Sequence, residues 1–149
     1  MIIAIGSDHR GFEHKQHIIT HFKSSQINYI DIGSYNTERS DYPEFAIKVA
    51  QAMQEKKADL GILICGSGVG MAITANRFKD IYAGVAWNSE VARIAREHDN
   101  VNLLVLPSDY ISAEVAHACV MQWMHTQFLG DRYQQRITMI DALGGLTVK

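Results

Sequence analysis

The chain has 149 residues, of which 47% are hydrophobic and 20% charged, and its formal net charge is −2. This length suits one domain with its own core, and the composition excludes disordered and fibrous proteins. The slightly negative net charge does not provide the positive surface that nucleic-acid binding requires. No apolar run approaches the length of a membrane span. We therefore expect a single domain over residues 1–149 that binds neither nucleic acid nor membrane. Because Met1 leads directly into a strand-like run without a basic flank or cleavage pattern, we also expect a cytoplasmic location.

Short apolar runs alternate with helical patterns along the chain. Strands are predicted at residues 2–5, 29–32, 60–64, 82–86 and 103–106. Apolar stripes predict helices around residues 12–22, 46–53, 71–77, 91–98, 113–128 and 137–143. Strands that are apolar at successive positions are typical of a parallel sheet covered by helices on both faces. The sequence therefore predicts an α/β fold, a three-layer αβα Rossmann-like sandwich with a five-stranded parallel sheet.

A cysteine stands where the third predicted strand meets the next helix. Residues 65–70 read Cys-Gly-Ser-Gly-Val-Gly, and glycines there let backbone N–H groups point at an anion. A helix N-terminus favours a thiolate and lowers the pKa of a thiol, so we expect Cys65 to be a base or a nucleophile. The alternative is a small apolar residue that ends a buried strand. The segment matches neither the Walker pattern nor the dinucleotide-binding fingerprint.

Other polar residues follow the predicted strands at the edge where open α/β sheets bind ligands. Asp8 and His9 follow the first strand and would lie beside the cysteine if the first and third strands are neighbours. Asp8 could instead only cap a helix. His98 ends an apolar helix stripe, where a buried structural histidine is the alternative. Arg132 and Arg136 share a helix face, a spacing that suits either a phosphate clamp or a solvated flank.

The remaining cysteine and histidines predict no metal or redox site. Cys65 and Cys119 are the only cysteines and show no zinc or dithiol spacing, and Cys119 lies on an apolar helix face where it would pack in the core. His14, His17 and His21 lie at helical spacing, but no carboxylate or cysteine stands at ligand spacing with them. We expect these histidines on an exposed edge of the first helix, and no bound metal.

Five segments stand in an order that spans nearly the whole chain. They are Gly-Ser-Asp-His-Arg-Gly-Phe at residues 6–12, Ser-Asp-Tyr-Pro at 40–43, Cys-Gly-Ser-Gly-Val-Gly at 65–70, Arg-Glu-His-Asp-Asn at 96–100 and Asp-Arg-Tyr-Gln-Gln-Arg at 131–136. Together they resemble the ribose-5-phosphate isomerase type B family, which also includes galactose-6-phosphate isomerase subunits. The resemblance implies a homodimer with shared active sites. Two such dimers could pair into a tetramer.

The implied reaction is the aldose–ketose isomerisation of D-ribose 5-phosphate and D-ribulose 5-phosphate in the pentose phosphate pathway, without a metal or cofactor. The alternative is an isomerase of a six-carbon sugar phosphate, either allose 6-phosphate or galactose 6-phosphate. By the resemblance, the catalytic residues are Cys65 as the base that forms an enediolate, His98 at ring opening and Ser67 at a substrate hydroxyl. The implied substrate-binding residues, with the two arginines reaching in from the partner, are Asp8, His9, Tyr42, Gly66, Gly68, Val69, Gly70, Asp99, Arg132 and Arg136.

The chain departs from the family pattern at several of these places. Ser67 stands where threonine is common, Asp99 where asparagine is usual and Tyr133 where histidine is frequent. Asp109 occupies a position where many members carry a phosphate-side arginine, and residues 90–91 read Glu-Val in place of a Tyr-Ser pair. These departures leave open whether the substrate has five or six carbons and which histidine opens the sugar ring.

Overall fold

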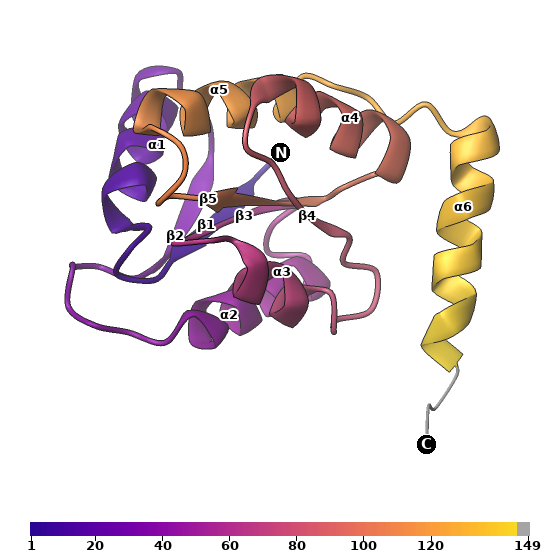
Figure 1. The fold of residues 1–149 in the computed structure, drawn as a ribbon, viewed down its shortest axis with the longest axis horizontal. Coiled ribbons are helices and arrows are strands. Elements are labelled where there is room, and N and C mark those ends of the chain that lie inside the picture. The colour runs from indigo at the N-terminus through magenta and orange to yellow at the C-terminus, as the bar shows by residue number, and fades with distance from the viewer. Residues whose placement is uncertain (146–149) are drawn as a thin grey trace.

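A computed structural model describes residues 1–145 and contains one five-stranded parallel sheet (Figure 1). The strand order across the sheet is β2-β1-β3-β5-β4. The strands are β1 (Ile3–Ser7), β2 (Tyr29–Gly33), β3 (Leu60–Cys65), β4 (Ala83–Val85) and β5 (Leu103–Pro107). The predicted α/β class and the five parallel strands are confirmed, with strand ends displaced by one or two residues.

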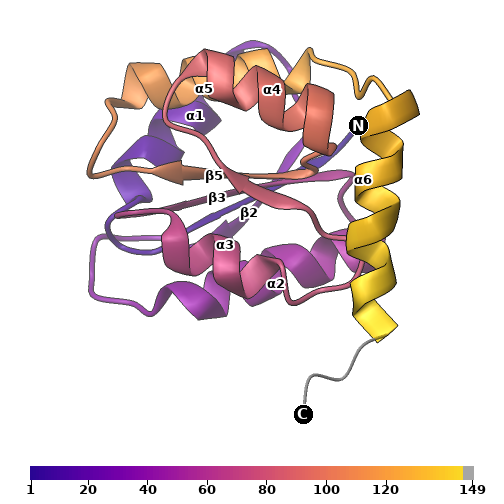
Figure 2. The ribbon, with the colours of Figure 1, turned by 45° about the vertical axis from the view of Figure 1, so that its right-hand side comes forward.

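Helices cover both faces of the sheet, as the apolar strands predicted (Figure 1). On one face lie α1 (Phe12–Ser24), α4 (Ser89–Asp99) and α5 (Ala113–Met124), and on the other lie α2 (Tyr42–Gln54) and α3 (Val69–Ala75). The last helix, α6 (Asp131–Ala142), is followed by the short 3-10 helix η1 (Leu143–Gly145). Figure 2 shows α6 standing upright at one end of the three layers.

The central strand β3 is buried on both faces because it contributes to two cores. Ile62 and Ile64 belong to the core beneath α1 and α5, whereas Leu63 and Cys65 belong to the core above α2 and α3. Since side chains alternate along a strand, a continuous apolar run is what a doubly covered central strand requires. Cys65 therefore reaches the carboxyl edge of the sheet as the last residue of a fully buried strand.

One predicted helix is shifted along the chain, and one prediction about side chains is wrong. The helix predicted at residues 71–77 is α3, which begins earlier, at Val69, because Gly68 (φ +78°) turns the chain directly into it. The histidines of α1 are half-buried rather than on an exposed edge, because α5 packs beside α1. The rings of His21 and His117 stack there with centroids 3.9 Å apart, and His17 lies against His21.

Within residues 1–145, no helix is both long and apolar enough to cross a bilayer. In the same part of the chain, no group of three or more His, Cys, Asp or Glu side chains is arranged to hold a metal ion.

Candidate active site

The loops after β1 and β3 lie side by side at the point where the strand order reverses. The chain leaves β1 through α1 to β2 on one side, and then crosses to β3 on the other side of β1. In open α/β sheets this reversal opens a crevice at the carboxyl ends of the strands. The backbone N–H of Asp8 donates to the carbonyl of Ile64 in β3 at 3.2 Å, so the loop after β1 begins beside the end of β3. The condition for the expected proximity, that the first and third strands are neighbours, is met. The charge of Asp8 acts on Cys65 at the start of the cysteine loop, residues 65–70.

The sulfur of Cys65 faces the start of α3. The backbone N–H of Gly68 donates to Sγ at 3.2 Å, and Cys65 itself is only 4% exposed. Gly68 has the left-handed φ that glycine adopts without strain, and this conformation aims its amide back at the sulfur. The hydroxyl of Ser67 is exposed and accepts the N–H of Val69 at 3.3 Å. The cysteine loop thus surrounds a buried sulfur with amide donors.

Burial raises the pKa of the Cys65 thiol above its usual value. The amides of Gly68, Met71 and Ser67 lower this pKa, and the charge of Asp8 raises it further. The prediction that the helix start would leave a lowered pKa is therefore wrong for the single chain, because the loss of hydration outweighs the amides. The amides lower the free energy of forming the thiolate, but the thiol stays the favoured form at neutral pH.

Asp8 shapes the turn that leads into α1. Its Oδ1 accepts the N–H groups of Arg10 at 2.9 Å and Gly11 at 3.1 Å, and the residue is buried. A Cβ on Gly11 would lie 2.7 Å from the carbonyl carbon of Ile64, so only glycine allows α1 to start this close to β3. Asp8 therefore holds the turn that precedes α1, whose N-cap residue is Gly11, and its role at the substrate stays a prediction.

His9 follows β1 and bonds to Ser40 in the loop before α2, and Tyr42 is the first residue of α2. The N–H of His9 donates to Ser40 Oγ at 3.1 Å, and the Ser40 N–H donates to His9 Nδ1 at 3.2 Å. His9 Nδ1 also lies 3.2 Å from the carbonyl oxygen of Ser40. The phenol ring of Tyr42 lies against Gly70, where a Cβ would come 2.7 Å from the Tyr42 oxygen. Because Gly70 has no side chain, the Tyr42 ring can pack over the start of α3.

An ion pair that sequence reasoning missed bridges the loops on both sides of Cys65. Arg10 and Asp109 form a salt bridge, and the N–H of Asp109 donates to the carbonyl of Gly66 at 3.0 Å. A Cβ on Gly66 would lie 2.7 Å from Asp109 Oδ2 and 3.0 Å from Arg10 Nε. We call this pair the Arg10–Asp109 clasp. The sequence showed Asp109 as a departure from the family pattern, but no local pattern predicts that its side chain pairs with Arg10.

The other predicted site residues lie at the opposite edge of the sheet. Cys65 pairs with Pro107 at the end of β5, whereas Leu103 at the start of β5 pairs with Gly61. His98 and Asp99 end α4 just before β5 begins, which puts them at the amino edge. Arg132 and Arg136 belong to α6, which stands at that end of the molecule (Figure 2). Within one chain, the structure does not bring these four residues to Cys65.

Three of these residues gather around an aromatic ring that sequence reasoning did not assign to the site. His98 stacks on Tyr133 with ring centroids 4.3 Å apart and planes 6° apart. The guanidinium carbons of Arg132 and Arg136 lie 4.9 Å and 5.5 Å from the centre of the Tyr133 ring. We call these four residues the Tyr133 cluster. An aromatic residue between two arginines on one helix is the signal that could have found it.

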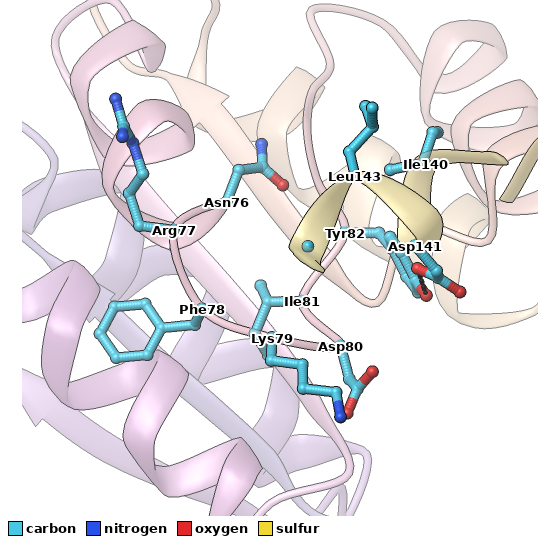
Figure 3. Close-up of a pocket in the computed structure, with 11 residues that line it drawn as sticks. Asn76, Arg77, Phe78, Lys79, Asp80, Ile81, Tyr82, Ile140, Asp141 and Leu143 are labelled. Atoms are coloured by element: carbon cyan, nitrogen blue, oxygen red, sulfur yellow. Dashed lines mark hydrogen bonds between the residues drawn. The ribbon is translucent and has the colours of Figure 1, made fainter. Parts of the chain in front are cut away.

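Cavities also lie away from Cys65. One of about 730 Å³ separates the end of α6 from residues 76–82 (Figure 3), and one of about 350 Å³ lies between the end of α2 and residues 79–81. Neither is lined by a predicted site residue. At the first cavity, Tyr82 donates its hydroxyl to Asp141 at 2.7 Å and so ties α6 to the chain before β4 (Figure 3).

Comparison with known proteins identifies the family. The model of the family described as Ribose/Galactose Isomerase matches residues 3–140. This chain belongs to the ribose/galactose isomerase family. The resemblance seen in the five sequence segments is thereby confirmed, and with it the isomerase class of the protein.

Relatives match over nearly the full chain. Ribose-5-phosphate isomerase B of Escherichia coli (strain K12) is 40% identical over 141 residues, covering 95% of each chain. A crystal structure of a ribose 5-phosphate isomerase from Thermotoga maritima is 43% identical, has a TM-score of 0.92 and covers 95% of this chain and 97% of that one. The enzyme of Mycoplasma genitalium, solved with bound ribulose-5-phosphate, is 38% identical, has a TM-score of 0.91 and covers 98% of this chain and 97% of that one.

Proposed function

We propose that this protein interconverts D-ribose 5-phosphate and D-ribulose 5-phosphate as a cytoplasmic enzyme of the pentose phosphate pathway, without a metal or cofactor. Family membership supports an aldose–ketose isomerase, and relatives named ribose-5-phosphate isomerase B match this chain at 36–40% identity. One related structure holds ribulose-5-phosphate, the product of the proposed forward reaction.

Cys65 is the proposed base, and the observation that carries this role is its sulfur against the Gly68 amide. The thiolate would take the proton from C2 of the open-chain aldose and return it to C1. The resulting enediolate would be held by backbone N–H groups of the cysteine loop, with Ser67, whose hydroxyl is exposed, at a substrate hydroxyl. Burial raises the pKa of Cys65, so a cationic group close to the sulfur would favour the thiolate.

A second copy of the chain is the proposed source of the remaining site residues. His98, Asp99, Arg132 and Arg136 lie at the amino edge, away from the Cys65 of their own chain. In a homodimer with shared sites, this group would face the partner's cysteine loop, where the arginines join His9 on the phosphate and His98 opens the sugar ring. Asp8 and Tyr42 would line the sugar side, and dimers could pair further into a tetramer. Such a two-fold arrangement gives each dimer two identical sites.

A six-carbon sugar phosphate is the second candidate substrate, and the Arg10–Asp109 clasp favours it. The clasp places the Asp109 carboxylate beside Gly66 of the cysteine loop. A carboxylate there changes the shape and the charge of the substrate pocket, and a longer sugar phosphate would require both changes. A comparison of kcat/KM for ribose 5-phosphate, allose 6-phosphate and galactose 6-phosphate decides between the candidates.

Isotope exchange tests the proposed reaction. Ribose 5-phosphate deuterated at C2 should lose deuterium to water with the native protein and retain it with Cys65→Ala. Cys119→Ala is the matched control, because Cys119 is also buried but belongs to α5 and packs in the core on that face of the sheet. This variant should exchange like the native protein. Retention of deuterium by the native protein would refute the isomerase reaction. Exchange by Cys65→Ala would refute only the role of Cys65.

A further inference from the structure

Tyr133 contacts three of the four amino-edge residues that are proposed to complete the partner's site, namely His98, Arg132 and Arg136. Its ring stacks on the imidazole of His98, nearly parallel, at 4.3 Å. Its hydroxyl accepts a hydrogen bond from Arg132 Nη2 at 3.0 Å, and its ring lies within 5.5 Å of the guanidinium carbon of Arg136. No other described residue joins α4 to both arginines in this way.

These contacts matter because the arginines have little else to hold them. Both are exposed on α6, and Tyr133 is the only partner that the described residues give to the charged group of either one. A long exposed side chain that is free to change rotamer must lose that freedom when it binds an anion. A cation over an aromatic face is already partly ordered, so Tyr133 reduces the entropy that phosphate binding costs.

We propose that Tyr133 is a positioning residue of the isomerase, which holds His98, Arg132 and Arg136 in the arrangement that receives a sugar phosphate. This inference rests on the proposed function, in which these three residues complete the partner's site. Tyr133 itself acts through its neighbours and takes no proton from the sugar.

Two substitutions separate the contributions of the hydroxyl and the ring. Tyr133→Phe keeps the stack and removes the acceptor for Arg132, so KM for ribose 5-phosphate and the Kd for inorganic phosphate should rise about threefold with kcat unchanged. Tyr133→Leu removes the ring, so both constants should rise about tenfold, equivalent to about 1.4 kcal/mol. Because His98 also loses its stack, kcat should fall in the leucine variant alone. Arg132→Ala sets the scale for losing one arginine.

Tyr82→Phe is the matched control for a general loosening of α6. It removes the 2.7 Å hydrogen bond from Tyr82 to Asp141 near the other end of the helix (Figure 3). Neither of these residues contacts Tyr133 through its ring or hydroxyl. Ile137, which is 3% exposed, still anchors α6 in each variant, and circular dichroism checks that the fold is kept. Tyr82→Phe should change neither KM nor the phosphate Kd.

Two results would overturn the inference. One is a folded Tyr133→Leu protein with native KM and native phosphate Kd. The other is a Tyr82→Phe protein that loses phosphate binding as strongly as Tyr133→Leu, since that would assign the effect to α6 as a whole. Calorimetry with inorganic phosphate needs no turnover, so it tests Tyr133 even if ribose 5-phosphate proves not to be the substrate. Absence of turnover by the native protein would bear on the proposed function instead.

Discussion

Mixing two separately inactive variants tests whether each active site draws on two chains. The first variant is Cys65→Ala, which removes the proposed base. The second is Arg132→Ala/Arg136→Ala, which removes the proposed phosphate ligands of α6. If both halves of a site came from one chain, every chain in the mixture would carry a defective site. If they come from different chains, a mixed dimer has one site with both defects and one with none.

The expected recovery follows from the structure. Cys65 and Pro107 pair at one end of β5, and α4 returns to the other end at Leu103. Four steps of about 3.3 Å along the strand separate these edges by about 13 Å, whereas proton transfer and hydrogen bonding need heavy atoms within about 3 Å. Random pairing makes about half of the dimers mixed, and each mixed dimer has one intact site of two, so about a quarter of native activity should return.

The assay is the rate of ribulose 5-phosphate formation after the two variants are unfolded together in urea and refolded at equal concentration. Distinct affinity tags on the two variants confirm that mixed dimers have formed. A mixture of Cys65→Ala with Cys65→Ser is the control, because both defects then lie in the same half and no intact site can arise. Mixed dimers without any recovered turnover would refute the shared site, and with it the separation of roles between the two edges of the sheet.

Two further predictions concern the stability of the fold. Gly11→Ala should lower the free energy of unfolding by about 2–3 kcal/mol, because its Cβ would overlap the backbone of β3. A Cβ on Gly144 would meet no atom of residues 1–145 within 4 Å, so Gly144→Ala should change this free energy by less than about 0.5 kcal/mol. Equal urea midpoints for the two variants would contradict the steric argument. Burial, and then the charges of His21 and His17, lower the pKa of His117 from 6.5. Because the unfolded chain then binds a proton more readily, stability should be unaffected above about pH 6.5 and should fall as the pH drops below it. His117→Gln should reduce this loss in urea titrations between pH 8 and 5, and an unchanged slope would refute the assignment.

Most of the fold and half of the candidate site could be predicted from the sequence because they depend on local patterns. The apolar run before Cys65 marks a buried strand, and the glycines after it mark a turn into a helix. The prediction that Asp8 lies near Cys65 depended on one further condition, that β1 and β3 are neighbours. The structure meets this condition. Helical spacing identified the arginines of α6 as a pair, but it carries no information on where a helix packs, so only the family resemblance implied that they serve the partner's site.

The sequence by itself determined the order of strands and helices, the position of the cysteine loop at a strand end and the resemblance to the isomerase family. These follow from periodicity and spacing among residues that are near one another in the chain. Only the tertiary structure decided the direction of the Cys65 pKa, the Arg10–Asp109 clasp and the gathering of His98 and α6 around Tyr133. Burial, ion pairing and ring stacking depend on which distant segments meet, and that choice is made by the packing of the whole sheet and its helices.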